Sequence, residues 1–335
     1  MRKLIVAIVL LLTILFVVTR FADIEQVVRT FQRGDPRWLA MAVGVHLLAI
    51  VNLGLLLRSI YRVLGMEEGA GRLMLVGVAS TFLTVVTSSG GWGGIAVFVA
   101  DGRRRGLSTG RVAVAAAMYY LFDFVSALIV ISLGLIVLLR RNRLEGGELA
   151  AAAVLAAYAL VLAVLLYLGL RSPERLGRLL ESIGRWINAR LRGLLHRDYV
   201  DVSRARQLAL DMGAGLHDAR RTPEGLILPA ALALSHKGLM VSVLFLVFLA
   251  FQQPFSVGTL IAGFGLAYLF MVVTPTPAGI GFVEGLLTLA LNGLQIPLAS
   301  AAVITLAYRG ITLWLLLLYG AIAFRWIGGG RTAAG

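Results

Sequence analysis

The chain has 335 residues, of which 59% are hydrophobic and only 14% are charged. Its mean hydropathy is +0.89, and long apolar runs recur along its whole length. These values predict an all-α polytopic membrane protein and exclude a separate soluble catalytic domain, because the spans use nearly all of the chain. The absence of cysteine excludes disulfide bonds and thiolate metal sites.

The formal net charge of +14 comes mostly from arginine, since Lys3 and Lys237 are the only lysines. Many of these arginines lie at the ends of apolar runs, at the level of the lipid headgroups. Anionic lipid is therefore the expected partner of this charge. No nucleic-acid-binding pattern accompanies it, so nucleic acid is not expected, and the sequence indicates no oligomeric state.

Apolar segments follow one another from the N-terminus to the C-terminus. They cover residues 4–19, 38–57, 73–100, 112–139, 149–170, 226–251, 257–291 and 299–324. The first follows a basic start and could be a signal peptide, but it has no small-residue cleavage site. We therefore expect a retained anchor.

Two of the segments are interrupted by similar sequences. Residues 83–96 read LTVVTSSGGWGGIA and residues 270–283 read FMVVTPTPAGIGFV. Helix breakers at membrane depth are tolerated only where the freed backbone lines protein or a water-filled cavity. Matching breaks in two halves indicate a transporter binding site. The alternative is a pair of kinked helices that pack through small residues.

The charge distribution predicts how the chain crosses the membrane. Single crossings throughout would place Arg103–Arg105 and the Arg-rich stretch 171–221 outside, against the positive-inside rule. If 73–100 and 257–291 are re-entrant hairpins, both stretches and both termini become cytoplasmic. The arginines that this layout leaves outside are Arg140, Arg141 and Arg143. We therefore expect about six full spans plus two re-entrant hairpins in the cell membrane.

This layout makes the chain a single transmembrane domain, 1–335, with an inverted repeat. Unit 1, about 38–139, and unit 2, about 226–324, run through the membrane in opposite directions, with 149–170 as a connecting span. Such repeats are typical of alternating access, with the substrate site near the midplane where the units meet.

The insert 171–221 follows the connecting span on the cytoplasmic side. Its leucines and isoleucines recur at helical spacing between 174 and 197, and arginines occupy the remaining positions. This predicts an Arg-rich amphipathic helix, 174–197, that lies on an anionic lipid surface. A helix packed on the underside of the bundle is the equal alternative.

Ionisable residues at membrane depth are the main candidates for function, because a charge at the centre of a span costs about 2.5–3.5 kcal/mol. Asp123 and Arg309 occupy nearly equivalent positions in the two units, so they are candidates to pair, with Glu284 as the alternative partner of Arg309. We expect Arg309 and Lys237 to attract an anionic headgroup, balanced by the acids. Purely structural ion pairs are the alternative. The expected substrate-binding residues are Arg309, Glu284, Asp123, Lys237, Thr87, Ser88, Ser89, Thr274, Thr276, Gly279, Gly281, His46, Asn52 and His236.

His46 and His236 lie one in each unit, in the first span. Histidines at such positions are usually hydrogen-bonded core residues, and proton coupling is the alternative. Two histidines without carboxylate or thiolate neighbours do not indicate a metal site, so no metal or cofactor is expected. Helix N-termini after Gly94 and Gly281 are further candidates to bind an anionic phosphate.

Residues 274–284 read TPTPAGIGFVE. This resembles the Pro-x-Pro-x-Gly-x-Gly-x-x-Glu signature of the lysylphosphatidylglycerol synthase transmembrane (flippase) family. Asp123, Tyr308-Arg309 and the basic turn after the first hairpin fit it too, whereas the first hairpin carries Ser and Gly where many members have Arg and Glu. The resemblance implies re-entrant hairpins in an inverted repeat and lipid movement between leaflets. Because nothing follows Gly335, we expect a stand-alone member without the synthase domain.

We therefore expect a lipid flippase rather than an enzyme. Its cargo would be an anionic, aminoacylated or glycosylated lipid that moves through a cavity where the repeats meet. No ATP-binding motif is present, so movement is expected to be facilitated or ion-coupled. The alternatives are an integral membrane enzyme that acts on a lipid-linked substrate and a non-catalytic scaffold subunit. The loops contain no cluster of residues with catalytic spacing, so nothing in them favours the enzyme.

Overall fold

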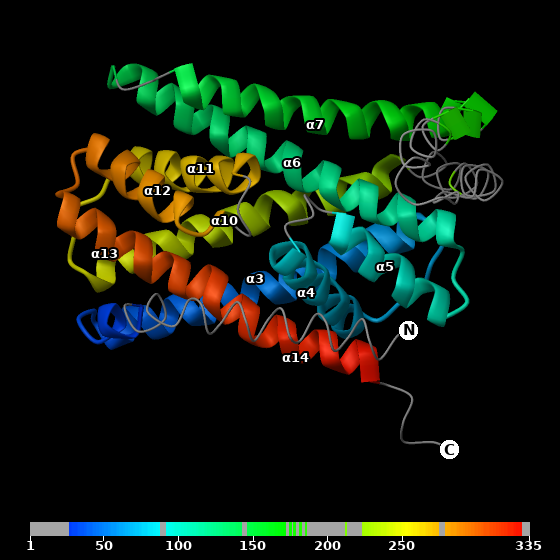
Figure 1. Cartoon of the computed structure of the whole chain (residues 1–335), viewed down its shortest axis with the longest axis horizontal. Coiled ribbons are helices and arrows are strands. Elements are labelled where there is room, and N and C mark those ends of the chain that lie inside the picture. Colours follow the sequence, from blue (N-terminus) through cyan, green and yellow to red (C-terminus); the bar gives the residue numbers. More distant parts are fainter. Residues whose placement is uncertain are drawn as a thin grey trace.

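The computed structural model describes residues 27–87, 92–142, 146–171, 223–274 and 279–329, with isolated residues between 174 and 212. Within these residues every element is a helix (Figure 1). The expected anchor 4–19 and most of the helix expected at 174–197 lie outside them. The chain is a polytopic helical membrane protein, as expected from its composition.

Two pairs of shorter helices separate the longer helices along the chain. Their bounds are α3 Pro36–Val63, α4 Ala70–Thr87, α5 Trp92–Arg104, α6 Thr109–Arg140, α7 Gly146–Arg171, η1 Pro223–Leu226, α10 Ile227–Ala250, α11 Val257–Val273, α12 Phe282–Gly293, α13 Leu298–Arg309, the π-helical segment η3 Gly310–Trp314 and α14 Leu315–Gly329. Five stretches in the described residues are long and apolar enough to cross a membrane. They comprise α3, α6, α7, α10 together with the preceding turn η1, and α13 continued through η3 into α14.

The shorter helices form two pairs where the sequence predicts hairpins. α4 packs on α5, and α11 packs on α12. The first pair is interrupted between Thr87 and Trp92 and the second between Thr274 and Phe282, at the Gly-rich and Pro-rich breaks. In Figure 1 the two pairs occupy opposite halves of the bundle, with α4 and α5 toward one end and α11 and α12 toward the other.

Side-chain caps set where several helices begin. Asp35 accepts a hydrogen bond from the Arg37 N–H (2.9 Å) and Pro36 follows at the first helical position of α3. Ser256 accepts from the Thr259 N–H (3.1 Å) at the start of α11. These caps satisfy backbone donors that have no partner inside a first helical turn.

The packing of the helices relates the two halves of the chain. α3 makes its most extensive contact with α10, the corresponding first helix of the second half. α11 packs along α6, and α4 packs along α14 in the same crossed manner. α7 lies outside this arrangement, against α6 and α11 (Figure 1). Each hairpin therefore contacts the last helix of the other half, and α4 packs equally on α3 of its own half.

Glycines allow α6 and α11 to approach closely. A Cβ added to Gly134 would lie 3.1 Å from the Cα of Ala262, and one added to Gly265 would lie 3.3 Å from the Cα of Ile131. Small residues at such contacts let two backbones approach in a membrane, where apolar surface alone gives no preference for helix over lipid.

Arg141 joins the end of α6 to the start of α11. Its Nη2 donates to the Ser256 hydroxyl (2.9 Å) and its Nη1 donates to the Thr259 hydroxyl (3.4 Å). Arg141 is one of the three arginines that the expected topology places outside. Its contacts give this residue a packing role that is independent of the positive-inside rule.

Candidate functional site

Asp123 forms a buried ion pair that joins three helices. Its Oδ1 lies 2.5 Å from the Nζ of Lys237, and its Oδ2 accepts a hydrogen bond from the hydroxyl of Tyr268. Asp123 is on α6, Lys237 on α10 and Tyr268 on α11. The ammonium group also lies 4.1 Å from the centre of the Tyr268 ring, a cation–π contact. Both carboxylate oxygens and the ammonium group thus have partners, which a buried charge pair requires.

Arg309 forms a second ion pair at the break of the α11–α12 hairpin. It is only 4% exposed, and its Nε donates to the Oε1 of Glu284 (2.8 Å). The Oε2 of Glu284 accepts from the Gly281 N–H (2.7 Å), which caps α12. Gly279 and Gly281 have φ values of +69° and +84°, in the region that favours glycine. Glu284 therefore connects the end of α13 to the first turn after the break.

The observed partner of Asp123 differs from the one expected from the sequence. Pairing of Asp123 with Arg309 was expected from their equivalent positions in the two units, and this pairing is wrong. Asp123 binds Lys237 instead, while Arg309 binds Glu284, the alternative partner. The reason is helix packing, because α6 lies against α10 and α11.

Polar groups also occupy the contact between α3 and α10. The Asn52 amide donates to the Ser235 hydroxyl (2.8 Å), and His236 Nδ1 lies 3.2 Å from the Ala49 carbonyl oxygen. His46 is buried on the same helix as Asn52, and its ring centre lies 6.1 Å from that of Tyr319 on α14. Neither ring nitrogen of His46 has a hydrogen-bond partner within the described residues. The predicted residues His46, Asn52 and His236 thus lie along one helix contact, beside Lys237.

Three hydroxyl groups converge on Gly94, at the start of α5. The Tyr120 hydroxyl is hydrogen-bonded to both Ser80 and Thr84. A Cβ added to Gly94 would lie 2.5 Å from Ser80 Oγ and 2.7 Å from Thr84 Oγ1, with Tyr120 Oη closer still. Only a glycine leaves room for this cluster. Tyr120 is one helical turn before Asp123, so the hydroxyls continue the polar region into the first hairpin.

The remaining predicted residues lie at the two breaks. Thr274 follows α11 and its hydroxyl donates to the Phe270 carbonyl (2.5 Å), while Thr87 is the last residue of α4. Ser88, Ser89 and Thr276 lie outside the described residues. The residues that our sequence reasoning missed are Ser80, Thr84, Tyr120, Ser235, Tyr268 and Tyr319. A Ser/Thr pair at i and i+4 before the break was the available signal for Ser80 and Thr84.

The polar region combines charged groups of both signs with neutral polar groups. It offers two cations, two anions and several neutral hydroxyls inside an apolar bundle. Within the described residues, no group of three or more His, Cys, Asp or Glu side chains is arranged to hold a metal ion. Intramembrane charges of this kind mark substrate pathways in many transport proteins.

Comparison with known proteins places the chain in a family. Residues 4–320 match the family described as the lysylphosphatidylglycerol synthase TM region. A comparison with curated proteins gives no significant match. The family match includes both hairpins, both ion pairs and every described helix through the start of α14. The chain therefore belongs to the lysylphosphatidylglycerol synthase TM region family.

Proposed function

We propose that this protein is a lipid flippase. It moves an anionic, aminoacylated or glycosylated lipid between leaflets, with the headgroup passing between the two halves of the bundle and the acyl chains remaining in the bilayer. The observation that carries the proposal is the pair of buried ion pairs, Asp123–Lys237 and Glu284–Arg309. The family match supports it, since the family is a membrane region associated with lipid movement rather than a catalytic domain.

The two ion pairs favour a headgroup that carries both charges. Removing one partner of a buried pair is costly because the other charge remains buried, whereas replacing both partners is tolerated. A phosphate replaces a carboxylate beside Lys237 or Arg309, and an amino group replaces a cation beside Asp123 or Glu284. An aminoacylated phospholipid provides both groups in one headgroup. The hydroxyls around Gly94 provide the neutral hydrogen bonds that a glycosylated headgroup needs.

The helix packing supports an inverted repeat as the basis of alternating access. Exchange of the two halves maps the contact of α4 with α14 onto that of α11 with α6, and leaves the contact of α3 with α10 in place. The proposed topology puts both termini in the cytoplasm and the hairpins on opposite sides of the cell membrane. The Arg-rich stretch 174–197 then contacts anionic lipid on the cytoplasmic surface.

A transport assay with the purified protein tests this function. The protein is reconstituted into liposomes that contain a trace of fluorescent phosphatidylglycerol or lysyl-phosphatidylglycerol, and an impermeant quencher reports the label exposed outside. We expect the protein to make the inner-leaflet label accessible without changing the mass of the lipid. A changed lipid mass would identify an enzyme, and neither movement nor a mass change would indicate a scaffold.

The variant Leu160→Ala is a matched control for this assay. Leu160 on α7 is 65% exposed, and neither ion pair includes a residue of α7. It is therefore expected to transport at the wild-type rate. A rate reduced as much as by changes at the ion pairs would show that the assay reports general damage to the bundle.

A further inference from the structure

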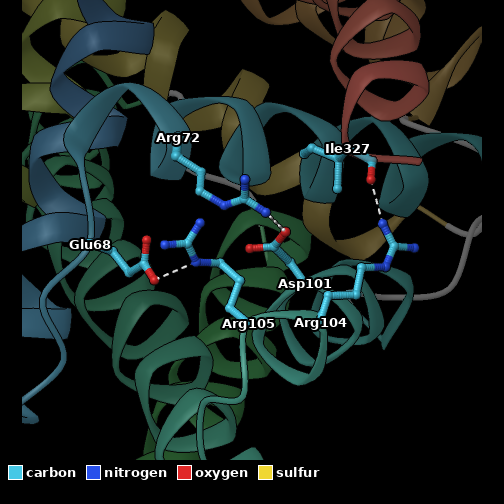
Figure 2. Close-up of polar contacts among 6 residues, drawn as sticks. All are labelled: Glu68, Arg72, Asp101, Arg104, Arg105 and Ile327. Carbon is cyan, nitrogen blue, oxygen red and sulfur yellow. Dashed lines mark hydrogen bonds and ion pairs between the residues drawn. The ribbon is translucent and has the colours of Figure 1, made fainter. Parts of the chain in front are cut away.

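Two crossed ion pairs tie together the base of the first hairpin (Figure 2). Arg72, on the first turn of α4, places its Nη2 2.5 Å from Asp101 Oδ1 near the end of α5. Arg105, just after α5, places its Nε 2.7 Å from Glu68 Oε1 just before α4. In each ion pair, therefore, the cation lies on one arm of the hairpin and the anion lies on the other arm.

The cations of these pairs are exposed, but the anions are not. The side chains of Asp101 and Glu68 are 8% and 6% exposed, whereas those of Arg72 and Arg105 are 38% and 42% exposed. The carboxylates thus lie beneath the guanidinium groups, which face outward. The Nε of Arg72 is buried and has no hydrogen-bond partner within the described residues. A buried N–H without an acceptor is costly, so this position favours an additional acceptor.

The base of the hairpin lies at the edge of the apolar bundle. Arg104 donates a hydrogen bond to the carbonyl of Ile327 near the end of α14 (Figure 2). The neighbouring Trp326 is 71% exposed, and Arg325 is exposed beside it. Exposed Trp and Arg at the end of an apolar helix are typical of the membrane–water interface. Arg72 and Arg105 are therefore at the depth of the lipid headgroups.

The base also carries more positive charge than its own ion pairs neutralise. Between residues 58 and 111, which enclose the hairpin and its flanking turns, the chain has seven arginines and three carboxylates. The acids are Glu67, Glu68 and Asp101, and the last two are already held by arginine. The resulting excess of positive charge in this stretch attracts anions.

We infer that the base of the first hairpin is a binding site for the phosphate of a net-anionic phospholipid headgroup, held by Arg72 and Arg105. A guanidinium group that uses one edge for a carboxylate has further N–H donors for phosphate oxygens. Two such groups on adjacent helix ends form a fork for one phosphodiester, and Asp101 and Glu68 orient them from below. This site lies apart from the intramembrane ion pairs. The inference rests on the proposed function in one respect, namely that the bound lipid is the cargo before it enters the bundle.

The test compares lipid binding by variants that keep the net charge constant. The variants Arg105→Gln/Glu68→Gln and Arg72→Gln/Asp101→Asn each remove one cation and one anion while retaining hydrogen-bonding groups. The matched control, Arg33→Gln/Glu224→Gln, removes one exposed cation and one exposed anion that lie outside the base of the hairpin. Binding is measured as the rise in melting temperature of the detergent-purified protein with dioctanoyl-phosphatidylglycerol, dioctanoyl-phosphatidylcholine or inorganic phosphate.

We expect each variant at the base to bind phosphatidylglycerol about fivefold more weakly than wild type, because each basic side chain near the surface contributes about that factor. The control should bind as wild type. Unchanged binding by both base variants overturns the site. Equal stabilisation by phosphatidylcholine overturns the preference for an anionic headgroup, and saturation by inorganic phosphate alone identifies a free-phosphate site instead.

Two further measurements keep the result decisive. If the neutral pairs unfold the hairpin, Arg72→Lys/Arg105→Lys retains both ion pairs and loses only the guanidinium forks, so weaker binding is again expected and wild-type binding overturns the site. Transport is measured separately in liposomes. Lipid movement together with unchanged binding by the base variants refutes this site alone, whereas specific binding without any lipid movement refutes the flippase proposal alone.

Discussion

Glu284 holds Arg309 with one carboxylate oxygen and the backbone of Gly281 with the other, at 2.8 and 2.7 Å. One acidic side chain thus fixes both the buried guanidinium group and the first turn of the helix after the break. Any change that draws Arg309 away from Glu284 also acts on the second hairpin.

Replacement of Arg309 separates a structural role from a substrate-binding role. Arg309→Met leaves the partly buried Glu284 without its cation, so we expect a loss of stability of at most about 3–5 kcal/mol and no transport. Arg309→Met/Glu284→Gln removes both charges and keeps an acceptor for the Gly281 N–H, so stability should largely return. Thermal unfolding and the liposome assay measure the two properties. Full transport by the stable double variant would eliminate Arg309 as a substrate ligand.

Tyr268 is expected to stabilise the bundle through its contact with the Asp123–Lys237 pair. Tyr268→Phe removes a hydrogen bond to a charged group, which costs about 1.5–3 kcal/mol. In the background Lys237→Met/Asp123→Leu the carboxylate is absent, so the same change should cost much less. Melting temperatures of the four proteins give the coupling energy between Tyr268 and the pair. Equal costs in both backgrounds would show that Tyr268 stabilises the bundle independently of Asp123.

The hydroxyl cluster around Gly94 predicts a specific steric effect. The Cβ of Gly94→Ala would overlap Ser80 Oγ and Thr84 Oγ1, so we expect destabilisation of about 1–3 kcal/mol and reduced transport. Gly44 is the matched control, because it is exposed within α3 and an added Cβ meets no atom within 4 Å. Gly44→Ala should stabilise the helix by up to about 1 kcal/mol. A stable, fully active Gly94→Ala protein would contradict a functional role for this cluster.

The proposed topology can be checked by chemical labelling, since the native chain contains no cysteine. Arg103→Cys at the end of α5 and Pro254→Cys between α10 and α11 both occupy exposed positions. An impermeant thiol reagent added to intact cells should label Pro254→Cys and not Arg103→Cys. Permeabilised cells provide the control, in which both should react. External labelling of Arg103→Cys would show that the first hairpin does not enter from the cytoplasm.

Much of the helix pattern follows from local sequence. Apolar runs long enough to span a bilayer predict α3, α6, α7, α10 and the helix from α13 to α14, each to within about two turns of its observed bounds. Gly and Pro inside apolar segments predict both hairpin breaks. Hydropathy and helix breakers act over a turn or two of chain, so neighbouring residues suffice to locate these features.

The sequence also determined which residue types form the site, because ionisable groups are conspicuous in apolar spans. Their partners depended on the tertiary structure. Asp123 meets Lys237 across 114 residues of sequence and Tyr268 across 145 residues, and Tyr120 meets Ser80 and Thr84 on another helix. A helix presents a different face after a rotation of one residue, about 100° at 3.6 residues per turn. Which charges meet is therefore decided by how α6, α10 and α11 pack around one another, and no local pattern in the sequence contains that information.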